Sequence, residues 1–429
     1  MNDPWWMIVI KVVVLFVLLL AWTIFNVWYE RRLVGKMQHR KGPIMNGPFG
    51  LGQALADGMK ALIKEDFMPS MVDKVLFTLA PIISGTAAFT AWALIPFGGE
   101  VEIFGVTTKL QVADLPVGVL VILAVTSVGI YGFVLAGWSS NSPYPLLGAL
   151  RSSAQMISYE VSMGLSFAAV FLYAGSMSTS DIVGKQGEGF ALFNLDIGLQ
   201  NWYWLSLLPS FLIYVVSMVG ETNRAPFDLV EAESELVSGY ITEYSGFRYA
   251  IYFLAEYINM ATVSAIATTL FMGGYHCPWP LSLWEPLNNP WLGPVWFIIK
   301  VQLFISLFVW LRGTLPRFRY DQFMSLGWKG LIPISAGWLL LVAIIREAQQ
   351  QGWLTSQWFY GIVLGAAAII LVLLLFTSPK PPPAEVDTSP EVIDAFAGGF
   401  PVAPLPGQVL ADETHPAPKP PKPEVEVLP

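Results

Sequence analysis

The sequence predicts an all-α polytopic membrane protein with about nine transmembrane helices and one cytoplasmic amphipathic helix. Of its 429 residues, 55% are hydrophobic and 13% are charged, whereas a soluble domain carries roughly 25% charged residues. Apolar runs of about 17 to 25 residues recur along the chain, and each can cross a hydrocarbon core of roughly 30 Å as a helix. A barrel would need alternating segments of about 10 residues, so the continuous runs favour helices, which satisfy their own backbone in lipid.

The apolar runs and the flanking charges predict both the spans and their orientation. The loops after odd-numbered spans carry 15 Lys and Arg residues, against 3 in the loops after even-numbered spans. Because cytoplasmic loops accumulate these residues, we expect the N-terminus outside the plasma membrane and the C-terminus in the cytoplasm. The first span is retained rather than cleaved, since no small-residue cleavage site follows it. The predicted spans are 7–28, 75–95, 115–138, 154–177, 203–220, 249–273, 295–311, 331–345 and 358–376.

Two regions follow from this pattern. Residues 1–377 are expected to form the transmembrane domain, whose cytoplasmic functional loops are 29–74, 139–153, 221–248 and 312–330. Residues 378–429 contain 14 prolines in 52 positions, which predicts an extended or disordered tail. A strap that docks on a neighbouring subunit remains the alternative for this tail.

The first cytoplasmic loop contains a predicted amphipathic helix. Leu51, Leu55, Met59 and Leu62 follow one another at helical spacing and share one face, as in a helix at a membrane surface. Asp57, Lys60 and Lys64 line the adjoining face. Simple anchoring at the interface and the mouth of a ligand channel both fit this pattern.

The other cytoplasmic loops concentrate carboxylates. Glu160 falls in the first turns of the fourth span, where an ionised side chain is expensive and indicates a functional site or a paired packing role. The fifth loop carries Glu221, Asp228, Glu231, Glu233 and Glu235, and the sixth span contains Glu256. Neighbouring carboxylates raise one another's pKa values, so the set fits a proton relay; a solvated acidic helix cap is the alternative.

The seventh loop places Arg312, Arg317 and Arg319 beside Asp321. The positive charge that orients cytoplasmic loops and a fixed ion-pair network explain these residues equally well. Lys300, inside the seventh span, is expected either to extend to the interface or to meet a carboxylate.

Several kinds of site are excluded by composition. The single cysteine, Cys277, excludes a self-contained iron–sulfur cluster, a cysteine zinc site and an intrachain disulfide. His39, His276 and His415 are too scattered for a metal site. The sequence has no phosphate-binding glycine loop, no nucleophilic triad and no basic, aromatic cluster for nucleic acid.

These loops closely resemble the H-subunit family of bacterial respiratory complex I, whose mitochondrial counterpart is the first subunit of the same enzyme. The resemblance covers roughly residues 25 to 335, in order. It rests on Glu30-Arg31-Arg32 through Arg40 with Gly42-Pro43 and Gly47-Pro48, Ala56-Asp57 to Lys64-Glu65, Gly148 to Glu160, Glu221 to Glu235, Glu243-Tyr244-Ser245-Gly246 and Leu315 to Gln322.

The resemblance implies a membrane component that joins the peripheral redox arm to the antiporter-like pump subunits and lines the quinone tunnel. No cofactor is implied for this chain: NADH, FMN and the iron–sulfur clusters belong to partner subunits, and small membrane subunits are further partners. By motif match, the quinone channel would be lined by Arg31, Arg32, Arg40, Asp57, Lys60 and Lys64. The proton relay would comprise Glu160, Glu221, Asp228, Glu231, Glu233, Glu235 and Glu256.

The chain departs from the family pattern in two places. Where the family usually continues with Asn-Arg after Gly42-Pro43, this chain has Ile44-Met45-Asn46, so one basic contact near the tunnel mouth is missing. Many relatives also stop after eight spans. Two alternatives remain: a related membrane subunit of a ferredoxin-, deazaflavin- or hydrogenase-linked complex, whose electron donor differs, and an ion-coupled secondary transporter, which the absence of an internal repeat disfavours.

Overall fold

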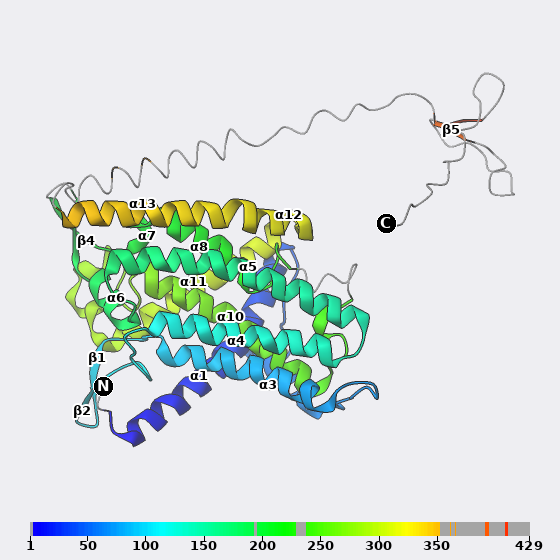
Figure 1. Cartoon of the computed structure of the whole chain (residues 1–429). Helices are drawn as coiled ribbons and strands as arrows, with labels where there is room; N and C mark the ends of the chain where they lie inside the picture. Colours follow the sequence, from blue (N-terminus) through cyan, green and yellow to red (C-terminus); the bar gives the residue numbers. More distant parts are fainter. Residues whose placement is uncertain are drawn as a thin grey trace. The chain divides into compact units, whose positions relative to one another are not determined.

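The structure, a computed structural model, describes residues 3–192, 195–228 and 237–351, with 361, 365, 391–393 and 408–410. The chain divides into two compact units, Met1–Ile369 and Ile370–Pro429. In the first unit, long helices lie side by side in a bundle (Figure 1). In the second unit, two short parallel strands pair, β5 (Glu391–Ile393) and β6 (Gln408–Leu410).

Seven helical segments among the described residues are long and apolar enough to cross a membrane, which confirms the predicted all-α polytopic membrane class. They are α1 (Trp5–Met37); α3 (Lys74–Ala91), prolonged by the 3-10 turn η2 (Trp92–Leu94); α4 (Gly118–Ser139); α5 (Pro143–Ala174); α10 (Gly246–Phe271); α11 (Gly293–Thr314), preceded by η6 (Pro290–Leu292); and α12 (Tyr320–Ser325) with α13 (Ile332–Gln350), joined by the π-helical turn η7 (Leu326–Leu331).

The predicted fifth span is a broken helix. It consists of α7 (Tyr203–Ser206) and α8 (Leu208–Glu221), separated at Leu207, whose backbone leaves the helical region. Eight of the nine predicted spans therefore correspond to helices. The ninth, 358–376, lies outside the described residues except for Gly361 and Gly365.

Three helices are longer than the sequence predicts. Residues 30–37, 143–153 and 320–330, which the apolar pattern assigns to cytoplasmic loops, are helical in the structure. An apolar run marks only the part of a helix that lipid covers. The helix forms its own backbone hydrogen bonds and can therefore continue into polar sequence. Glu30, Arg31 and Arg32 consequently lie on a helix rather than in a loop.

Short elements occupy the connections between the helices. On the side that includes β1, β2, β4 and α6 in Figure 1, the connections contain two antiparallel hairpins; we refer to it as the hairpin end. Its elements are β1 (Glu100–Ile103), β2 (Val106–Lys109), α6 (Thr179–Gln186), β3 (Gly189–Leu192), β4 (Leu195–Gln200), η4 (Leu281–Leu283) and η5 (Glu285–Asn288). The remaining connections contain η1 (Pro48–Gly50), α2 (Gly52–Ile63) and η3 (Gly239–Ile241).

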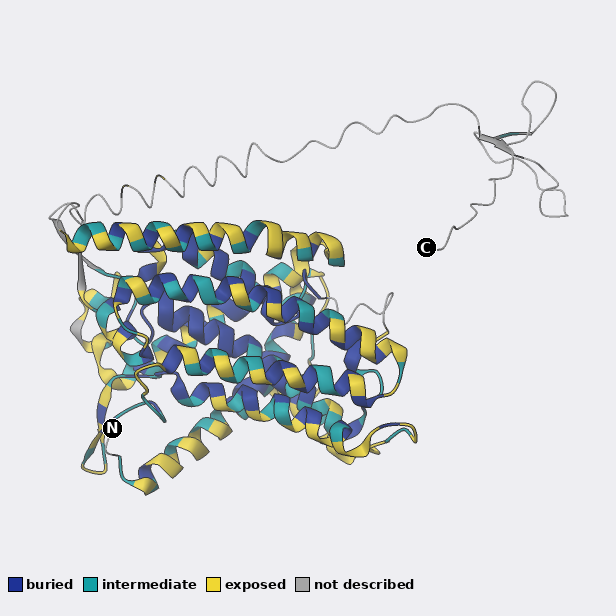
Figure 2. Ribbon diagram, viewed as in Figure 1, coloured by how far each residue is buried: buried dark blue, intermediate teal, exposed yellow. Residues whose placement is uncertain are grey.

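Small residues allow the helices to approach closely. A Cβ atom added at Gly132 of α4 would lie 2.8 Å from the Cβ of Ser84 and 2.9 Å from the carbonyl oxygen of Ala80, both on α3. Such contacts replace the hydrophobic driving force that helices lose in lipid. Buried residues concentrate between the helices, while the outer faces of α1 and α13 carry many exposed residues (Figure 2), several of them large and apolar, as lipid contact requires.

Candidate functional site

A buried carboxylate on α1 lies at the centre of a group of charged side chains. Glu30 is 5% exposed, and it pairs with Arg312 at the end of α11. The Tyr257 hydroxyl, on α10, donates a hydrogen bond of 2.7 Å to Glu30 Oε2. Three helices that are distant in sequence are thus tied together at one acid.

A buried arginine extends this group. The side chain of Arg224, which follows α8, lies with one nitrogen 3.5 Å from Glu30 Oε1 and another 3.5 Å from Glu256 Oε1. Its guanidinium also lies over the Tyr257 ring, 4.4 Å from the centroid, in the geometry of a cation–π contact. We define the charge cluster as Glu30, Arg224, Glu256, Tyr257 and Arg312; its two carboxylates and two guanidinium groups balance one another.

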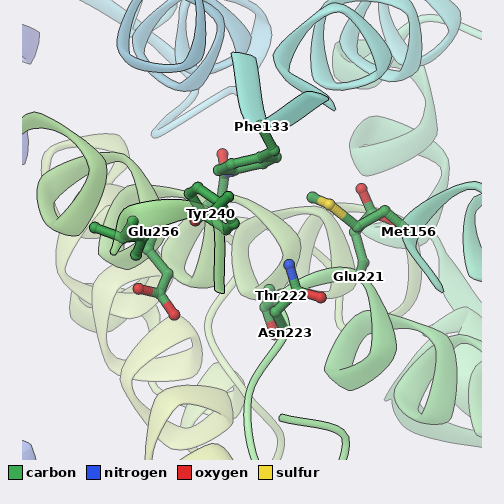
Figure 3. A pocket seen from close by; sticks show the side chains of 9 residues that line it. Phe133, Met156, Glu221, Thr222, Asn223, Tyr240 and Glu256 are labelled. Atoms are coloured by element: carbon green, nitrogen blue, oxygen red, sulfur yellow. The ribbon is translucent and has the colours of Figure 1, made fainter. Parts of the chain in front are cut away.

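Two predicted relay residues meet at a small cavity beside the charge cluster. Glu221 and Glu256 both line it, together with Phe133, Met156 and Tyr240 (Figure 3). Its volume is about 20 Å³, and one enclosed water needs roughly 10–15 Å³. Glu221 is 6% exposed, and no described residue offers a hydrogen-bond partner to its Oε2. The cavity therefore has the room and the polar wall that a water molecule between two acids requires.

Glu160 lies deeper in α5 than predicted. Because α5 begins at Pro143, Glu160 is near the middle of the helix rather than in its first turns. Its carboxylate accepts a hydrogen bond from Ser127 of α4, and it interacts electrostatically with Glu221. Glu256, in the predicted sixth span, is partly buried, with 16% of its side chain exposed.

The acidic segment after α8 is described only in part. Asp228 is buried and pairs with Arg317, whose nitrogen lies 3.3 Å from Oδ2. Glu231, Glu233 and Glu235 lie outside the described residues, so the single helical face predicted for this segment stays a prediction. Arg312 and Arg317, two of the three arginines of the seventh loop, form ion pairs, but with Glu30 and Asp228 rather than with Asp321 as the sequence suggested.

Three of the predicted quinone residues, Arg31, Arg32 and Asp57, join α1 to α2 and to the turn before it. Arg31 of α1 pairs with Asp57 of α2 at 2.6 Å, and Gln53 donates a hydrogen bond to the same carboxylate at 3.1 Å. Arg32 donates to the carbonyl oxygen of Phe49 at 3.0 Å and lies over the rings of Phe49 and Trp28. These contacts fix the start of α2 against α1.

Three further predicted residues are exposed. Lys60 and Lys64 are exposed at the end of α2, and Arg40 donates a hydrogen bond of 2.8 Å to Gln38. The predicted apolar face of α2 is present, and its four large side chains are all exposed: Leu51, Leu55, Met59 and Leu62.

Sequence reasoning missed the centre of the site. In the sequence, Glu30 only marks the end of the first predicted span. Nothing in the sequence around Arg224 or Tyr257 indicates that these residues meet it. An acid just beyond an apolar run, followed by two arginines, was the one available hint. Among the described residues, no group of three His, Cys, Asp or Glu side chains is placed to hold a metal ion.

The fold and the charge cluster define a polytopic helical membrane protein with a buried ionic network at one end. A family model described as NADH dehydrogenase matches residues 10–343. The H subunit of NADH-quinone oxidoreductase from Cutibacterium acnes is 57% identical over 411 residues, which cover 95% of this chain and 93% of the relative. The same subunit from Streptomyces avermitilis is 50% identical over 416 residues, or 95% of this chain and 89% of the relative.

The chain therefore belongs to the NADH dehydrogenase family that includes the H subunit of NADH-quinone oxidoreductase, a membrane component of respiratory complex I. The resemblance drawn from the loop motifs is confirmed. The alignments with these two relatives cover 95% of the chain and therefore extend past the eighth predicted span.

Proposed function

We propose that this chain lines the quinone-access tunnel of a proton-translocating NADH:quinone oxidoreductase and couples quinone reduction to proton movement through buried carboxylates. The observation that carries the proposal is the position of Arg224 between Glu30 and Glu256. Glu30 precedes the two arginines of the predicted tunnel, and Glu256 borders the cavity of the predicted relay. The charge cluster thus joins the two predicted sites.

The tunnel side is supported by the pairing of α1 with α2. The Arg31–Asp57 ion pair and the Arg32 contacts hold charged groups beside an exposed apolar face. An amphiphile with a polar headgroup and a long apolar tail, such as a quinone, fits a wall of this kind. The chain supplies the passage, and catalysis requires the peripheral-arm subunits that carry FMN and the iron–sulfur clusters.

The proposed proton relay is supported by a series of acidic residues that leads from the charge cluster into the bundle. Glu256 and Glu221 share the water-sized cavity, and Glu221 interacts with Glu160. A charge change near Glu30 alters how strongly Arg224 is held there, and therefore how strongly it stabilises the charged form of Glu256. The relay thereby responds to the tunnel through electrostatics and proton transfer together, with Asp228, Glu231, Glu233 and Glu235 as further members.

The proposed function also requires a particular orientation in the membrane. The N-terminus lies outside the plasma membrane, and the loops that carry the charge cluster and α2 face the cytoplasm, where the peripheral arm docks. The small membrane subunits and the antiporter-like pump subunits contact the bundle from the membrane plane.

Replacing Arg224 by Met tests the proposal. Removing one partner from a buried ion cluster costs roughly 3–5 kcal/mol where the remaining charge stays buried, so we expect NADH:quinone turnover and proton pumping to fall at least tenfold in membranes with normal amounts of assembled complex. NADH oxidation by a hydrophilic acceptor, which needs only the peripheral arm, should be unchanged.

Arg224→Lys is the matched control. A lysine keeps the charge but cannot contact two carboxylates through a planar fork, so we expect intermediate turnover. Wild-type turnover and pumping in Arg224→Met, with assembly verified, would overturn the proposal.

A further inference from the structure

A turn rather than a helix carries Arg224. The turn, which we call the Arg224 turn, runs from Glu221, the last residue of α8, to Asp228. Two of its residues, Thr222 and Asn223, line the water-sized cavity beside Glu221 (Figure 3). A turn lacks the repeated backbone hydrogen bonds that make a helix rigid. The position of Arg224 therefore depends on contacts that other segments make with the turn.

A single buried amide on α5 holds both ends of the Arg224 turn. Gln155 is 0% exposed. Its amide nitrogen donates to the carbonyl oxygen of Gly220 at 2.8 Å and to the carbonyl oxygen of Phe227 at 2.9 Å. Because both neighbours are acceptors, the nitrogen side of the amide must face them. One side chain thus fixes the residue before the turn relative to the residue near its end.

Two more residues on the same face of α5 contact the turn. Ser152 and Tyr159 lie three positions before and four positions after Gln155, so the three side chains share a helix face. The Ser152 hydroxyl accepts a hydrogen bond of 2.9 Å from the Asn223 amide, and the Tyr159 ring packs on Phe227 with centroids 5.9 Å apart. Helix α5 therefore contacts the turn in its middle as well as near its end.

We infer that Gln155 is a positioning residue, which holds the turn so that Arg224 lies between Glu30 and Glu256. This inference rests on the proposed function, in which Arg224 joins the tunnel to the relay. The Arg224 nitrogens lie 3.5 Å from an oxygen of each acid, already longer than an ideal hydrogen bond. A small displacement of the turn would therefore lose one of the two contacts. Gln155 carries no charge and acts through Arg224.

Gln186 on α6 provides a matched control. It is also 0% exposed, and its amide nitrogen donates to the carbonyl oxygens of Thr269 and Leu270 at 2.8 and 3.2 Å. Thr269 lies 13 residues beyond Glu256 on α10, roughly 20 Å along the helix axis. The two glutamines thus make the same kind of buried connection, but Gln186 makes it far from the charge cluster.

The test compares Gln155→Met with Gln186→Met in the assembled complex. Methionine is similar in size to glutamine but has no hydrogen-bond donor, so both changes should lower the melting temperature. Gln155→Met should also lower the kcat of NADH:quinone turnover about fivefold with little change in the KM for quinone, because a displaced group slows the reaction without altering the tunnel. Gln186→Met should keep the wild-type kcat per assembled complex.

Combining Gln155→Met with Arg224→Met separates positioning from a general weakening of the fold. If Gln155 acts through Arg224, the double variant should turn over as slowly as Arg224→Met alone, because the group to be positioned is already absent.

Ser152→Ala gives a second variant in case Gln155→Met does not assemble. Losing one hydrogen bond to the turn should lower kcat about twofold. Its control is Ser153→Ala, at a neighbouring buried position whose hydroxyl donates to Leu150 within α5. This control should keep the wild-type kcat, and equal kcat in the two serine variants would contradict the inference.

Three results for the glutamine variants would overturn the positioning role. These are a wild-type kcat in Gln155→Met, an equal loss of kcat in Gln155→Met and Gln186→Met, and effects of Gln155→Met and Arg224→Met that multiply in the double variant. Each of them leaves the proposed function intact as long as Arg224→Met is itself impaired. Wild-type turnover in Arg224→Met would instead overturn the proposed function, and the positioning role with it.

Discussion

The two ends of the helix bundle both bury charged side chains, but they neutralise them differently. In the charge cluster, Arg224 is shared by two carboxylates on different helices, each 3.5 Å away. At the hairpin end, the buried Lys300 donates to three backbone carbonyl oxygens, those of Met272, Gly274 and His276, at 2.7 to 2.9 Å. Backbone carbonyls cannot change protonation, whereas carboxylates can.

This difference separates a structural charge from one suited to coupling. Lys300 also lies over the Trp202 ring and joins α11 to the segment after α10. The sequence predicted that Lys300 would either meet a carboxylate or extend to the interface, and it does neither. The carbonyl oxygens just after α10 accept the hydrogen bonds of its ammonium group instead. Arg224, by contrast, lies between two groups that can gain or lose a proton, and the proposed coupling expects it to shift between them.

Among the changes that sharpen the comparison between the two ends, Lys300→Met is expected to have the largest effect, a loss of thermal stability. The change leaves three buried carbonyl groups without their donor, at roughly 1–3 kcal/mol each, so the melting temperature of the assembled complex should fall markedly. Turnover per assembled complex should stay near wild type, because the residue is structural. A loss of pumping at unchanged thermal stability would break the distinction between the two ends.

A smaller effect is expected from Asp57→Asn, which removes the ion pair with Arg31. Both side chains are more than one third exposed, and such pairs contribute about 0.2–1 kcal/mol. We therefore expect up to about a fivefold rise in the KM for quinone with little change in kcat. Glu65→Gln, a nearby exposed acid, serves as the control. A large fall in kcat would mean that Asp57 belongs to the relay rather than to the tunnel.

The smallest effect is expected at the hairpin end, from Asp114→Asn. Burial alone would raise the pKa of Asp114, but hydrogen bonds from Lys109 and Ser180 outweigh it and hold the pKa below its usual value. A lowered pKa contributes stability above the carboxyl's ordinary pKa, and this contribution is lost as the pH falls through the folded-state pKa. The free energy of unfolding of the wild type should thus exceed that of the variant by at most about 1 kcal/mol at pH 6 to 8. Thermal melts should show this difference in stability become smaller below about pH 4. A gap that widens in acid would contradict this sign.

The sequence predicted the membrane architecture well because its signal is local. Each apolar run reports its own burial in lipid, and the amphipathic face of α2 repeats at helical spacing. The same signal fails beyond the lipid, which is why the helical residues 30–37 and 143–153 were predicted as loops. The break at Leu207 gives no signal in hydropathy either.

The site was predicted only in part because its contacts are not local. Glu160, Glu221 and Glu256 are visible in the sequence as carboxylates in or beside apolar spans. Glu30 and Arg224 are separated by 194 positions, and nothing in one chain indicates that they meet. The partners of Arg312 and Arg317 likewise come from other segments, so the nearest acid in the sequence, Asp321, was misleading.

The measurement that tests the central claim most directly is a double-mutant cycle on Glu30 and Glu256. NADH:quinone turnover and proton pumping would be measured in Glu30→Gln, in Glu256→Gln and in the double variant, each after assembly is verified. If Arg224 couples the two acids, the effects will be non-additive by roughly 0.5–3 kcal/mol, and the double variant will be less impaired than the product of the single effects. Strictly additive effects would contradict a shared charge cluster between tunnel and relay.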